Sequence, residues 1–380
     1  MLKRNTDDAL AIIFTNSYDT LLPDLVAERS SASIPFAGRY RLCDFLISSL
    51  VQSNISNISL MCRQNYHSLM DHLGSGQEFD LARKNGGLNI VPPFAERQMN
   101  VYNGRVEALE SIRGYLQKCT EKYVILCDAN YAINFDFRKL IHAHKSSGAD
   151  VTMMYRKAEI PQAFFRPINK NQVYYTLNID NDRVTRILVN SKERGKVNYS
   201  MNCSIVERNR LIDLVEDAYV HGKTFFSRDV LSPNIGIMNI RAFEYTGYCA
   251  QVMDNKTYFQ ENMALLDDAN CEALFSGNTI YTKVRDDNPT RYMKGAVVKN
   301  AMVADGCIIE GEVENCVIFR GVHIAKGAKV KNCVLMQDTS VDENADIEYV
   351  ITDKNVTITS GKILSGNDSY QVFVSKGQTV

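Results

Sequence analysis

The feature that most constrains how this 380-residue chain folds is a six-residue period near its C-terminal end. From Gly295 onward, apolar residues recur every six positions in two triples: Ile318, Ile324 and Val330, then Leu335, Val341 and Ile347. An α-helix repeats every ~3.6 residues and a half-buried strand every two, so neither explains this spacing. A period of six is typical of short strands stacked in three-sided coils. We therefore predict a left-handed parallel β-helix, with an ordinary antiparallel β domain as the alternative.

Turn residues support the same prediction. Gly321, Gly327 and Asn344 each follow an apolar repeat residue by three positions, where a tight corner favours left-handed backbone geometry. A separate acyltransferase site in this region would need a catalytic histidine, and His323 is the only histidine it contains. We expect the hexapeptide region to serve assembly rather than chemistry.

The preceding part of the chain alternates short apolar runs with longer amphipathic stretches, which is typical of strands joined by crossover helices in a largely parallel sheet. The predicted strands cover residues 9–14, 55–61, 123–127 and 150–155, and the predicted helices cover 44–53 and 106–116. A chain of this length exceeds one usual core. We therefore predict an α/β domain over residues 1–285 and the β-helix over residues 286–380.

Charge and cysteine usage narrow the class of protein. The 43 Lys and Arg residues almost cancel the 44 Asp and Glu residues, so no basic footprint for nucleic acid or an anionic membrane is expected. The ten cysteines are scattered singly, which favours a reducing compartment. No apolar run approaches the ~20 residues that span a bilayer, and the N-terminus shows no signal-peptide pattern. We expect a soluble cytoplasmic protein whose partners are small molecules or proteins.

One long motif points to a known family. The segment from Arg29 to Phe45 reads RSSASIPFAGRYRLCDF and closely resembles RxKPAVPFGGxYRIIDF of bacterial ADP-glucose pyrophosphorylases (glucose-1-phosphate adenylyltransferases). His67-Ser-Leu69 resembles the family's HSL, and Asp286-Asp-Asn-Pro-Thr290 resembles the end of its catalytic domain. The resemblance implies a nucleotidyltransferase fold, with a Rossmann-like mixed-sheet sandwich followed by a left-handed β-helix. It also implies transfer of AMP from ATP to glucose 1-phosphate with Mg²⁺, giving ADP-glucose for glycogen synthesis.

The nucleotide loop departs from the family pattern. Where the family has LAGGxGTRL, this chain reads FTNSYDTLL over residues 14–22. Three glycines are replaced by Asn16, Ser17 and Asp19, and the phosphate-neutralising Arg is replaced by Leu21. Ser31 stands in place of a second cation, the Lys of RxKP. We interpret these changes as loss of ATP handling; a rearranged loop that still binds nucleotide through Asn16 and Ser17 is the alternative.

Two further positions bear on nucleotide recognition. Arg63 aligns with the Gln of the family's LTQY, and the family's GTADA becomes Gly104-Arg-Val-Glu-Ala108. The second change places a long side chain, Arg105, where the resemblance implies that adenine recognition needs small residues.

Carboxylates for Mg²⁺ remain in the sequence. Asp128 ends a predicted strand and matches the Asp of the family's AGDH, and Asp287 aligns with the second metal carboxylate, with Asp286 as a neighbouring rival. An Asp at the end of a strand is also a common cap or turn residue. Lys192 lies where the family has its sugar-phosphate lysine but lacks the Glu-Lys-Pro context, so a solvated loop lysine is the alternative.

These patterns leave three interpretations. The first is a regulatory, catalytically deficient subunit that resembles the D-type subunits of this family and forms a heterotetramer with a catalytic homologue, while homo-oligomers remain open. The second is a competent adenylyltransferase with a divergent loop, and the third is a sugar-phosphate or effector-binding sensor. Arg39 and Arg41 are candidates for binding a phosphorylated effector, although they are equally able to pair with carboxylates.

Overall fold

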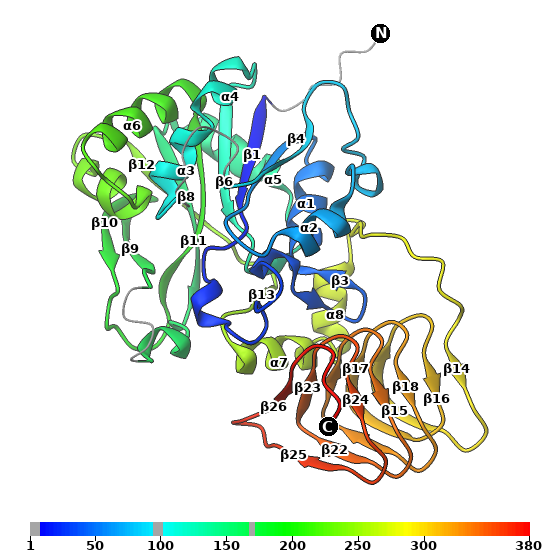
Figure 1. The fold of residues 1–380 in the computed structure, drawn as a ribbon. Helices are drawn as coiled ribbons and strands as arrows, with labels where there is room; N and C mark the ends of the chain where they lie inside the picture. Colours follow the sequence, from blue (N-terminus) through cyan, green and yellow to red (C-terminus); the bar gives the residue numbers. More distant parts are fainter. Residues whose placement is uncertain (1–7, 94–101, 167–171) are drawn as a thin grey trace. The chain divides into compact units, whose positions relative to one another are not determined.

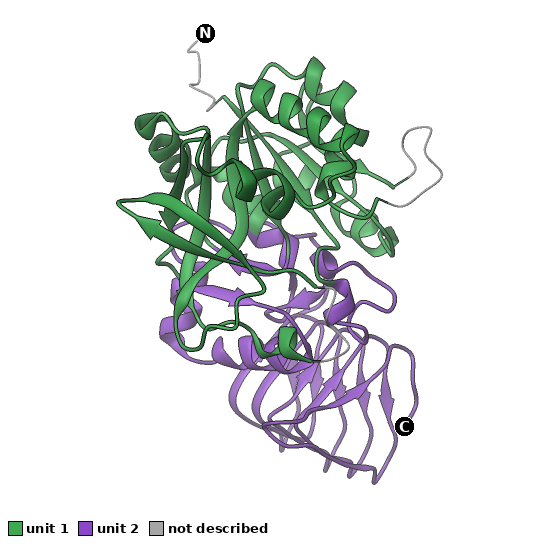
Figure 2. Ribbon diagram, turned by 90° about the vertical axis from the view of Figure 1, so that its left-hand side faces the viewer, with its two compact units in different colours: residues 1–18, 46–129, 134–247 green, residues 19–45, 130–133, 248–380 purple. Residues whose placement is uncertain are grey.

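The computed structural model describes residues 8–93, 102–166 and 172–380. The first seven residues, which belong to the N-terminus considered for a targeting signal, lie outside the described residues. The chain forms two compact units, coloured in Figure 2. Unit 1 contains residues 1–18, 46–129 and 134–247, and unit 2 contains residues 19–45, 130–133 and 248–380. Three segments that precede the predicted boundary at 285/286 therefore group with the hexapeptide region.

The main element of unit 1 is a nine-stranded sheet (Figure 1). Its strands are β1 (Ala9–Phe14), β4 (Asn57–Met61), β5 (Gly87–Val91), β6 (Tyr123–Asp128), β8 (Val151–Ala158), β9 (Tyr175–Asp180), β10 (Arg183–Val189), β11 (Val197–Glu207) and β12 (Ile240–Glu244). They are ordered β5-β4-β1-β6-β11-β8-β12-β10-β9. The strands β5, β4, β1 and β6 pair in parallel, whereas β11 is antiparallel to both β6 and β8.

Strand β1 shows why the sequence of this region predicts a strand. All six of its residues are buried, and a parallel strand covered on both faces forms a continuous apolar run rather than an alternating one. Its parallel partners β4 and β6 lie on either side. The carboxyl ends of β1 and β6 therefore meet at one edge of the sheet, where Phe14 pairs with Asp128.

The described residues contain eight α-helices. They are α1 (Leu42–Gln52), α2 (His67–Leu73), α3 (Arg105–Ser111), α4 (Arg113–Lys118), α5 (Phe137–Ser147), α6 (Arg208–Val220), α7 (Asn255–Ala264) and α8 (Asp268–Phe275). The helix expected at 106–116 is divided into α3 and α4, because Ile112 adopts φ −108° and ψ 13°, outside helical geometry. None of these helices is long and apolar enough to cross a membrane.

The hexapeptide region of unit 2 forms stacked coils of short strands (Figure 1). The strands are β14 (Arg291–Tyr292), β15 (Val297–Val303), β16 (Ile308–Ile309), β17 (Glu312–Ile318), β18 (His323–Ile324), β19 (Lys329–Lys331), β20 (Val334–Leu335), β21 (Ser340–Val341), β22 (Asp346–Glu348), β23 (Val350–Thr352), β24 (Thr357–Ile358), β25 (Ile363–Ser365) and β26 (Val372–Val374). They pair in parallel with the strands of neighbouring coils. The predicted parallel coil architecture is confirmed.

The register explains the six-residue period. Ile318 pairs with Leu335, and Ile324 pairs with Val341, so successive coils are offset by 17 positions. The six predicted repeat residues are all buried at 1% exposure or less. The three predicted corner residues have positive φ angles, which are 70° at Gly321, 77° at Gly327 and 58° at Asn344. The apolar repeat therefore lines the interior of the coils.

Unit 2 also contains segments that the predicted boundary at 285/286 assigned to the α/β domain. Its short strands are β2 (Pro35–Phe36), β3 (Tyr40–Arg41), β7 (Tyr131–Ile133) and β13 (Cys249–Gln251). Arg29 donates to both carboxylate oxygens of Asp353 at 2.6 and 3.0 Å, and both residues are buried. The Asn262 side chain on α7 accepts from the Ala37 N–H at 3.0 Å. Such contacts explain why residues 19–45 group with the coils.

Candidate functional site

Asp128 lies at the carboxyl end of β6, the sheet edge at which open α/β folds commonly bind ligands. It is buried, with 1% of its surface exposed. Its Oδ1 accepts hydrogen bonds from the Ser17 hydroxyl and from Arg105 Nη2, the latter at 2.5 Å. Its Oδ2 is buried and has no hydrogen-bond partner within the described ranges. The predicted metal carboxylate is therefore already paired with a cation of this chain.

Arg105 reaches Asp128 from the first position of α3. The preceding Gly104 lies against Thr224, whose carbonyl oxygen would be 2.4 Å from a Cβ at position 104, so only glycine fits there. The guanidinium donates through Nη1 to the Asn202 carbonyl at 3.2 Å and lies 4.6 Å from the centre of the Phe14 ring. Burial lowers the pKa of Arg105, but Asp128, together with Tyr18 and Tyr175, outweighs this effect and raises the pKa above its usual value. Arg105 is thus a permanent charge.

Tyr18, from the middle of the altered loop, lies in the same part of unit 1. It is buried, and its hydroxyl oxygen accepts a hydrogen bond from Asn202 Nδ2 at 2.5 Å. Its ring meets Phe164 edge to face, with 5.7 Å between ring centres. Burial, with contributions from Tyr199 and Asp128, raises the pKa of Tyr18 well above its usual value. The sequence analysis did not single out Tyr18, because it aligns with a variable position of the loop motif.

Asn16 connects the loop by hydrogen bonds to the segment that follows β4. Its Oδ1 accepts from the Arg63 main-chain N–H at 2.9 Å and from the Thr15 hydroxyl at 2.8 Å. Its Nδ2 donates to the Gln64 carbonyl at 3.1 Å. Arg63 therefore contributes its main chain to this arrangement. Asn16 and Ser17, which replace two of the family's glycines, thus use their polar side chains to form hydrogen bonds with other groups of this chain.

The remaining altered loop positions belong to unit 2. Asp19 accepts a hydrogen bond from the Ser31 N–H at 3.2 Å. Asp19, Leu21 and Ser31 are all buried. The Asp19 side chain therefore binds the main chain of Ser31 within unit 2, where Leu21 and Ser31 are buried.

Asp287, the second predicted metal ligand, also belongs to unit 2. Its Oδ1 accepts from Arg285 at 3.1 Å, and its Oδ2 lies 3.9 Å from Nε of the buried Arg320. The rival Asp286 is exposed. The predicted carboxylates Asp128 and Asp287 therefore lie in different units, and each has its own arginine partners.

Mg²⁺ is usually bound by one or two carboxylates together with substrate phosphates and water. Although Asp128 Oδ2 has no protein partner among the described residues, the adjacent Arg105 guanidinium neutralises this carboxylate and repels a divalent cation. Asp287 is likewise neutralised by Arg285 and Arg320. Neither carboxylate offers an uncompensated negative charge, so these residues do not fit the two-carboxylate magnesium site that the resemblance implied.

Lys192, the candidate sugar-phosphate lysine, lies in the loop between β10 and β11. Its side chain is exposed. On β11, Asn202 contacts Tyr18 through its side chain and Arg105 through its carbonyl.

A group of cations in unit 2 includes one of the predicted effector residues. Burial, followed by the positive charges of Arg41 and Arg29, lowers the pKa of Lys354 to about 7, although Asp353 opposes this shift. Arg41 is buried and donates to the Ser33 carbonyl at 3.4 Å. Arg39 is half exposed and lies 3.8 Å from Asp305. The sequence analysis did not identify Lys354, because no motif contains it and its neighbours in the structure come from distant parts of the chain.

Comparisons with known proteins agree with the fold. A nucleotidyl transferase family matches residues 10–164, and the family of GlmU-like C-terminal hexapeptide regions matches residues 283–372. "Glycogen biosynthesis protein GlgD" of Bacillus subtilis is 32% identical over 372 residues, 97% of this chain and 96% of the relative. The protein of the same name from Geobacillus stearothermophilus is 34% identical over 84% of this chain and 82% of its own length. "Glucose-1-phosphate adenylyltransferase" of Bacillus mycoides is 25% identical over 93% and 94% of the two chains.

Proposed function

Since this chain belongs to the family of GlgD glycogen biosynthesis proteins, which is related to the glucose-1-phosphate adenylyltransferases, we propose that it is a regulatory subunit in glycogen biosynthesis. On its own it has little or no adenylyltransferase activity. It acts by binding a catalytic homologue that converts ATP and glucose 1-phosphate to ADP-glucose and pyrophosphate. The cytoplasm is the expected location.

The observation that carries this proposal is the contact between Arg105 and Asp128. Nucleotidyl transfer depends on positioning and on cations that neutralise phosphate charge, often with bound Mg²⁺. Here the carboxylate at the expected metal position is paired with a guanidinium at 2.5 Å and with the Ser17 hydroxyl. The arrangement compensates the charge of Asp128 without a metal.

The loop contacts support the same proposal. Glycines at a phosphate loop allow main-chain N–H groups to approach the phosphates. In this chain Asn16 and Ser17 carry side chains that are bound to other parts of unit 1. Tyr18, which lies between Ser17 and Asp19 in the sequence, adds a buried aromatic ring to the loop. The family has phosphate-binding cations at two positions. This chain has Leu21 and Ser31 there, and both are buried and uncharged.

Regulation requires that this chain binds differently to the active and inactive states of its partner. We place the effector site at the cations around Lys354. A lysine whose pKa is held near 7 by burial and by Arg41 and Arg29 gains a counter-charge when a phosphorylated metabolite binds. A heterotetramer with the catalytic homologue is the assembly that we expect.

An activity assay tests the proposal. ADP-glucose formation is measured for the purified chain, for the catalytic homologue of the same organism and for their mixture, with ATP, glucose 1-phosphate and Mg²⁺ in excess. We expect the activity of the chain alone to be lower than that of the homologue by a factor of about 100 or more, because its site lacks the charge-stabilising groups. We also expect the mixture to differ from the homologue in rate or in effector response.

Two outcomes contradict this assignment. Turnover by the chain alone that is comparable with that of the homologue would establish the competent-enzyme alternative. Failure of the two chains to co-purify, with no change of activity on mixing, would favour the effector-binding sensor.

A further inference from the structure

Unit 2 contains a pocket that is remote in the sequence from the predicted nucleotide site. Figure 1 shows helix α7 beside the stacked coils, and the pocket opens between these two parts of unit 2. Its volume is about 420 Å³, which is in the range of sites for small molecules. Phe259, Met263 and Leu266, from α7 and the turn that follows it, form an apolar wall.

The opposite wall of the pocket is one corner of four successive coils. The strand register places one residue of each coil there, in the order Asn300, Asn315, Asn332 and Tyr349. Neighbouring strands are ~4.8 Å apart, so side chains from adjacent coils are able to contact the same ligand. We call the site formed by these four residues and the apolar wall the corner pocket.

Tyr349 is the unusual member of this column. The φ angles of the four residues are 46°, 52°, 49° and 52° in chain order. Asn adopts such left-handed backbone more readily than most residues, whereas a bulky residue is an outlier there. The Tyr349 ring lines the pocket, with 6.0 Å between its centre and that of Phe259. Unfavourable backbone geometry is concentrated at ligand-binding and active sites, so the Tyr349 ring points to a bound ligand.

The asparagine side chains leave hydrogen-bonding capacity in the pocket. Asn300 Nδ2 donates to Asn315 Oδ1 at 2.7 Å, and Asn332 Nδ2 donates to Glu348 Oε1 at 3.3 Å. Within the described ranges, Asn315 Nδ2 and Asn332 Oδ1 have no protein partner. Adjacent coils therefore offer one free donor and one free acceptor. A hydroxyl group matches this pair, because it accepts one hydrogen bond and donates another.

The charges around the pocket select the class of ligand. Asp267 and Asp368 contribute carboxylates, and no lysine or arginine lines the pocket among the described residues. An anionic ligand would be repelled. A protonated polyamine would pair with the carboxylates, but it has no acceptor for Asn315 Nδ2. A neutral ligand rich in hydroxyl groups satisfies all of these groups, since carboxylates accept strong hydrogen bonds from hydroxyls.

We propose that the corner pocket binds a neutral oligosaccharide. The apolar face of one sugar ring packs against the Tyr349 ring, and a hydroxyl group bridges Asn315 and Asn332. Further hydroxyl groups donate to Asp267 and Asp368. The column continues from coil to coil, so it fits a chain of sugar units better than a single sugar. This inference concerns unit 2 alone and does not depend on the proposed regulatory function.

Calorimetric titration of the full-length chain tests the proposal. The probe is maltohexaose, a linear oligosaccharide of glucose, because the chain belongs to a family of glycogen biosynthesis proteins. We expect a dissociation constant on the order of 1 mM, since an open pocket leaves part of the ligand in water. The affinity should change less than twofold between about 50 and about 500 mM NaCl, because salt screens only interactions between charges.

Two variants remove the contacts of the sugar while preserving the backbone of the coils. Asn315→Gly with Asn332→Gly removes both amides, and glycine adopts left-handed backbone without cost. Tyr349→Asn removes the ring and supplies the residue that the three preceding corners of the column already have. We expect each variant to bind maltohexaose at least tenfold more weakly than the unmodified chain.

The matched control makes the same substitution at other corners of the coils. Asn344 and Asn355 are exposed and have φ angles of 58° and 56°, but they do not line the pocket. Asn344→Gly with Asn355→Gly should therefore bind maltohexaose like the unmodified chain. Circular dichroism shows which variants are folded, and Tyr349→Asn provides the test if the pair of glycines at 315 and 332 prevents folding.

Three outcomes would overturn the proposal. The first is an unmodified chain that does not bind maltohexaose. The second is equal binding by the control and by the folded variants of the pocket, because the sugar would then bind elsewhere. The third is binding of spermidine in place of maltohexaose, weakened by salt and lost in the same variants, because the pocket would then be a site for cations.

Discussion

Arg105 and Asp128 form the most consequential pair at the scale of single residues. Breaking a buried ion pair by removal of one partner typically costs ~3–5 kcal/mol, because the other charge is left uncompensated. The Arg105 and Asp128 side chains are only 17% and 1% exposed. The pair therefore has a structural role in addition to its effect on the predicted metal position.

A double-mutant cycle measures this role. We expect Arg105→Ala to lower the free energy of unfolding by about 3 kcal/mol, and Arg105→Ala with Asp128→Asn to recover much of that loss. Urea denaturation with a common m-value gives the four free energies. Arg138→Ala removes an exposed partner of Asp136 and, as the control, should cost about 1 kcal/mol or less. Additive effects of Arg105→Ala and Asp128→Asn would contradict a strong pair.

At the scale of elements, the coils tolerate different changes at different glycines. Gly311 approaches the next coil so closely that a Cβ there would lie 2.4 Å from the Ala328 carbonyl oxygen. Gly361 has φ +70°, but a Cβ at this position would meet no described atom within 4 Å. The first glycine is needed for packing, and the second for backbone conformation.

This difference predicts unequal effects of the same substitution. We expect Gly311→Ala to destabilise the chain by about 3 kcal/mol, because the coils must move apart. Gly361→Ala should cost about 1 kcal/mol, the usual cost of left-handed backbone for a residue with a Cβ. Chemical denaturation followed by circular dichroism compares the two variants. Equal losses would mean that the close approach at Gly311 is relieved without cost.

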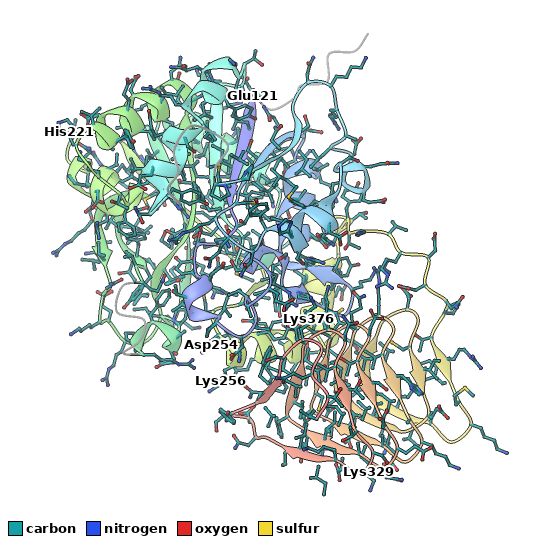
Figure 3. All side chains as sticks on the ribbon, viewed as in Figure 1. Glu121, His221, Asp254, Lys256, Lys329 and Lys376 are labelled. Atoms are coloured by element: carbon teal, nitrogen blue, oxygen red, sulfur yellow. The ribbon has the colours of Figure 1, made fainter. Side chains whose placement is uncertain are left out.

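At the scale of the whole molecule, Lys354 gathers charges from distant parts of the sequence. Its neighbours include Arg29 and Arg41 from near the N-terminus, together with Asp353 and Lys376. Lys376 itself pairs with Glu28 at 2.6 Å and is labelled in Figure 3. A pKa near 7 in the folded chain, against a usual lysine value near 10.5, makes stability depend on pH.

The sign of this dependence follows from proton binding. Between about pH 7 and pH 10.5 the unfolded chain holds a proton on Lys354 that the folded chain has released. Because the unfolded state binds more protons in this window, the contribution of Lys354 to stability rises with pH within it and is constant below and above it. We expect Lys354→Met to be more stable than the unmodified chain by about 1 kcal/mol at pH 6, and the difference to shrink toward pH 10. Urea denaturation at a series of pH values measures it. A difference that does not vary with pH would contradict the lowered pKa.

The architecture could be predicted because its signals are local and periodic. Each coil buries the same few positions, so the six-residue repeat of Ile318, Ile324 and Val330 appears directly in the sequence. The apolar run of β1 likewise reflects burial on both faces. The break between α3 and α4 at Ile112 was not predicted, because the apolar spacing continues across it.

The altered loop, the retained Asp128 and the unusual Arg105 were also visible in the sequence, by comparison with the family motifs. Only the tertiary structure decided that Ser17 and Arg105 bind Asp128, that Tyr18 is buried beside Asn202, and that Asp287 pairs with arginines of unit 2. The physical reason is that a repeat records how a residue is buried, whereas an ion pair depends on where two separate backbones place their side chains. No periodicity in the sequence encodes that position.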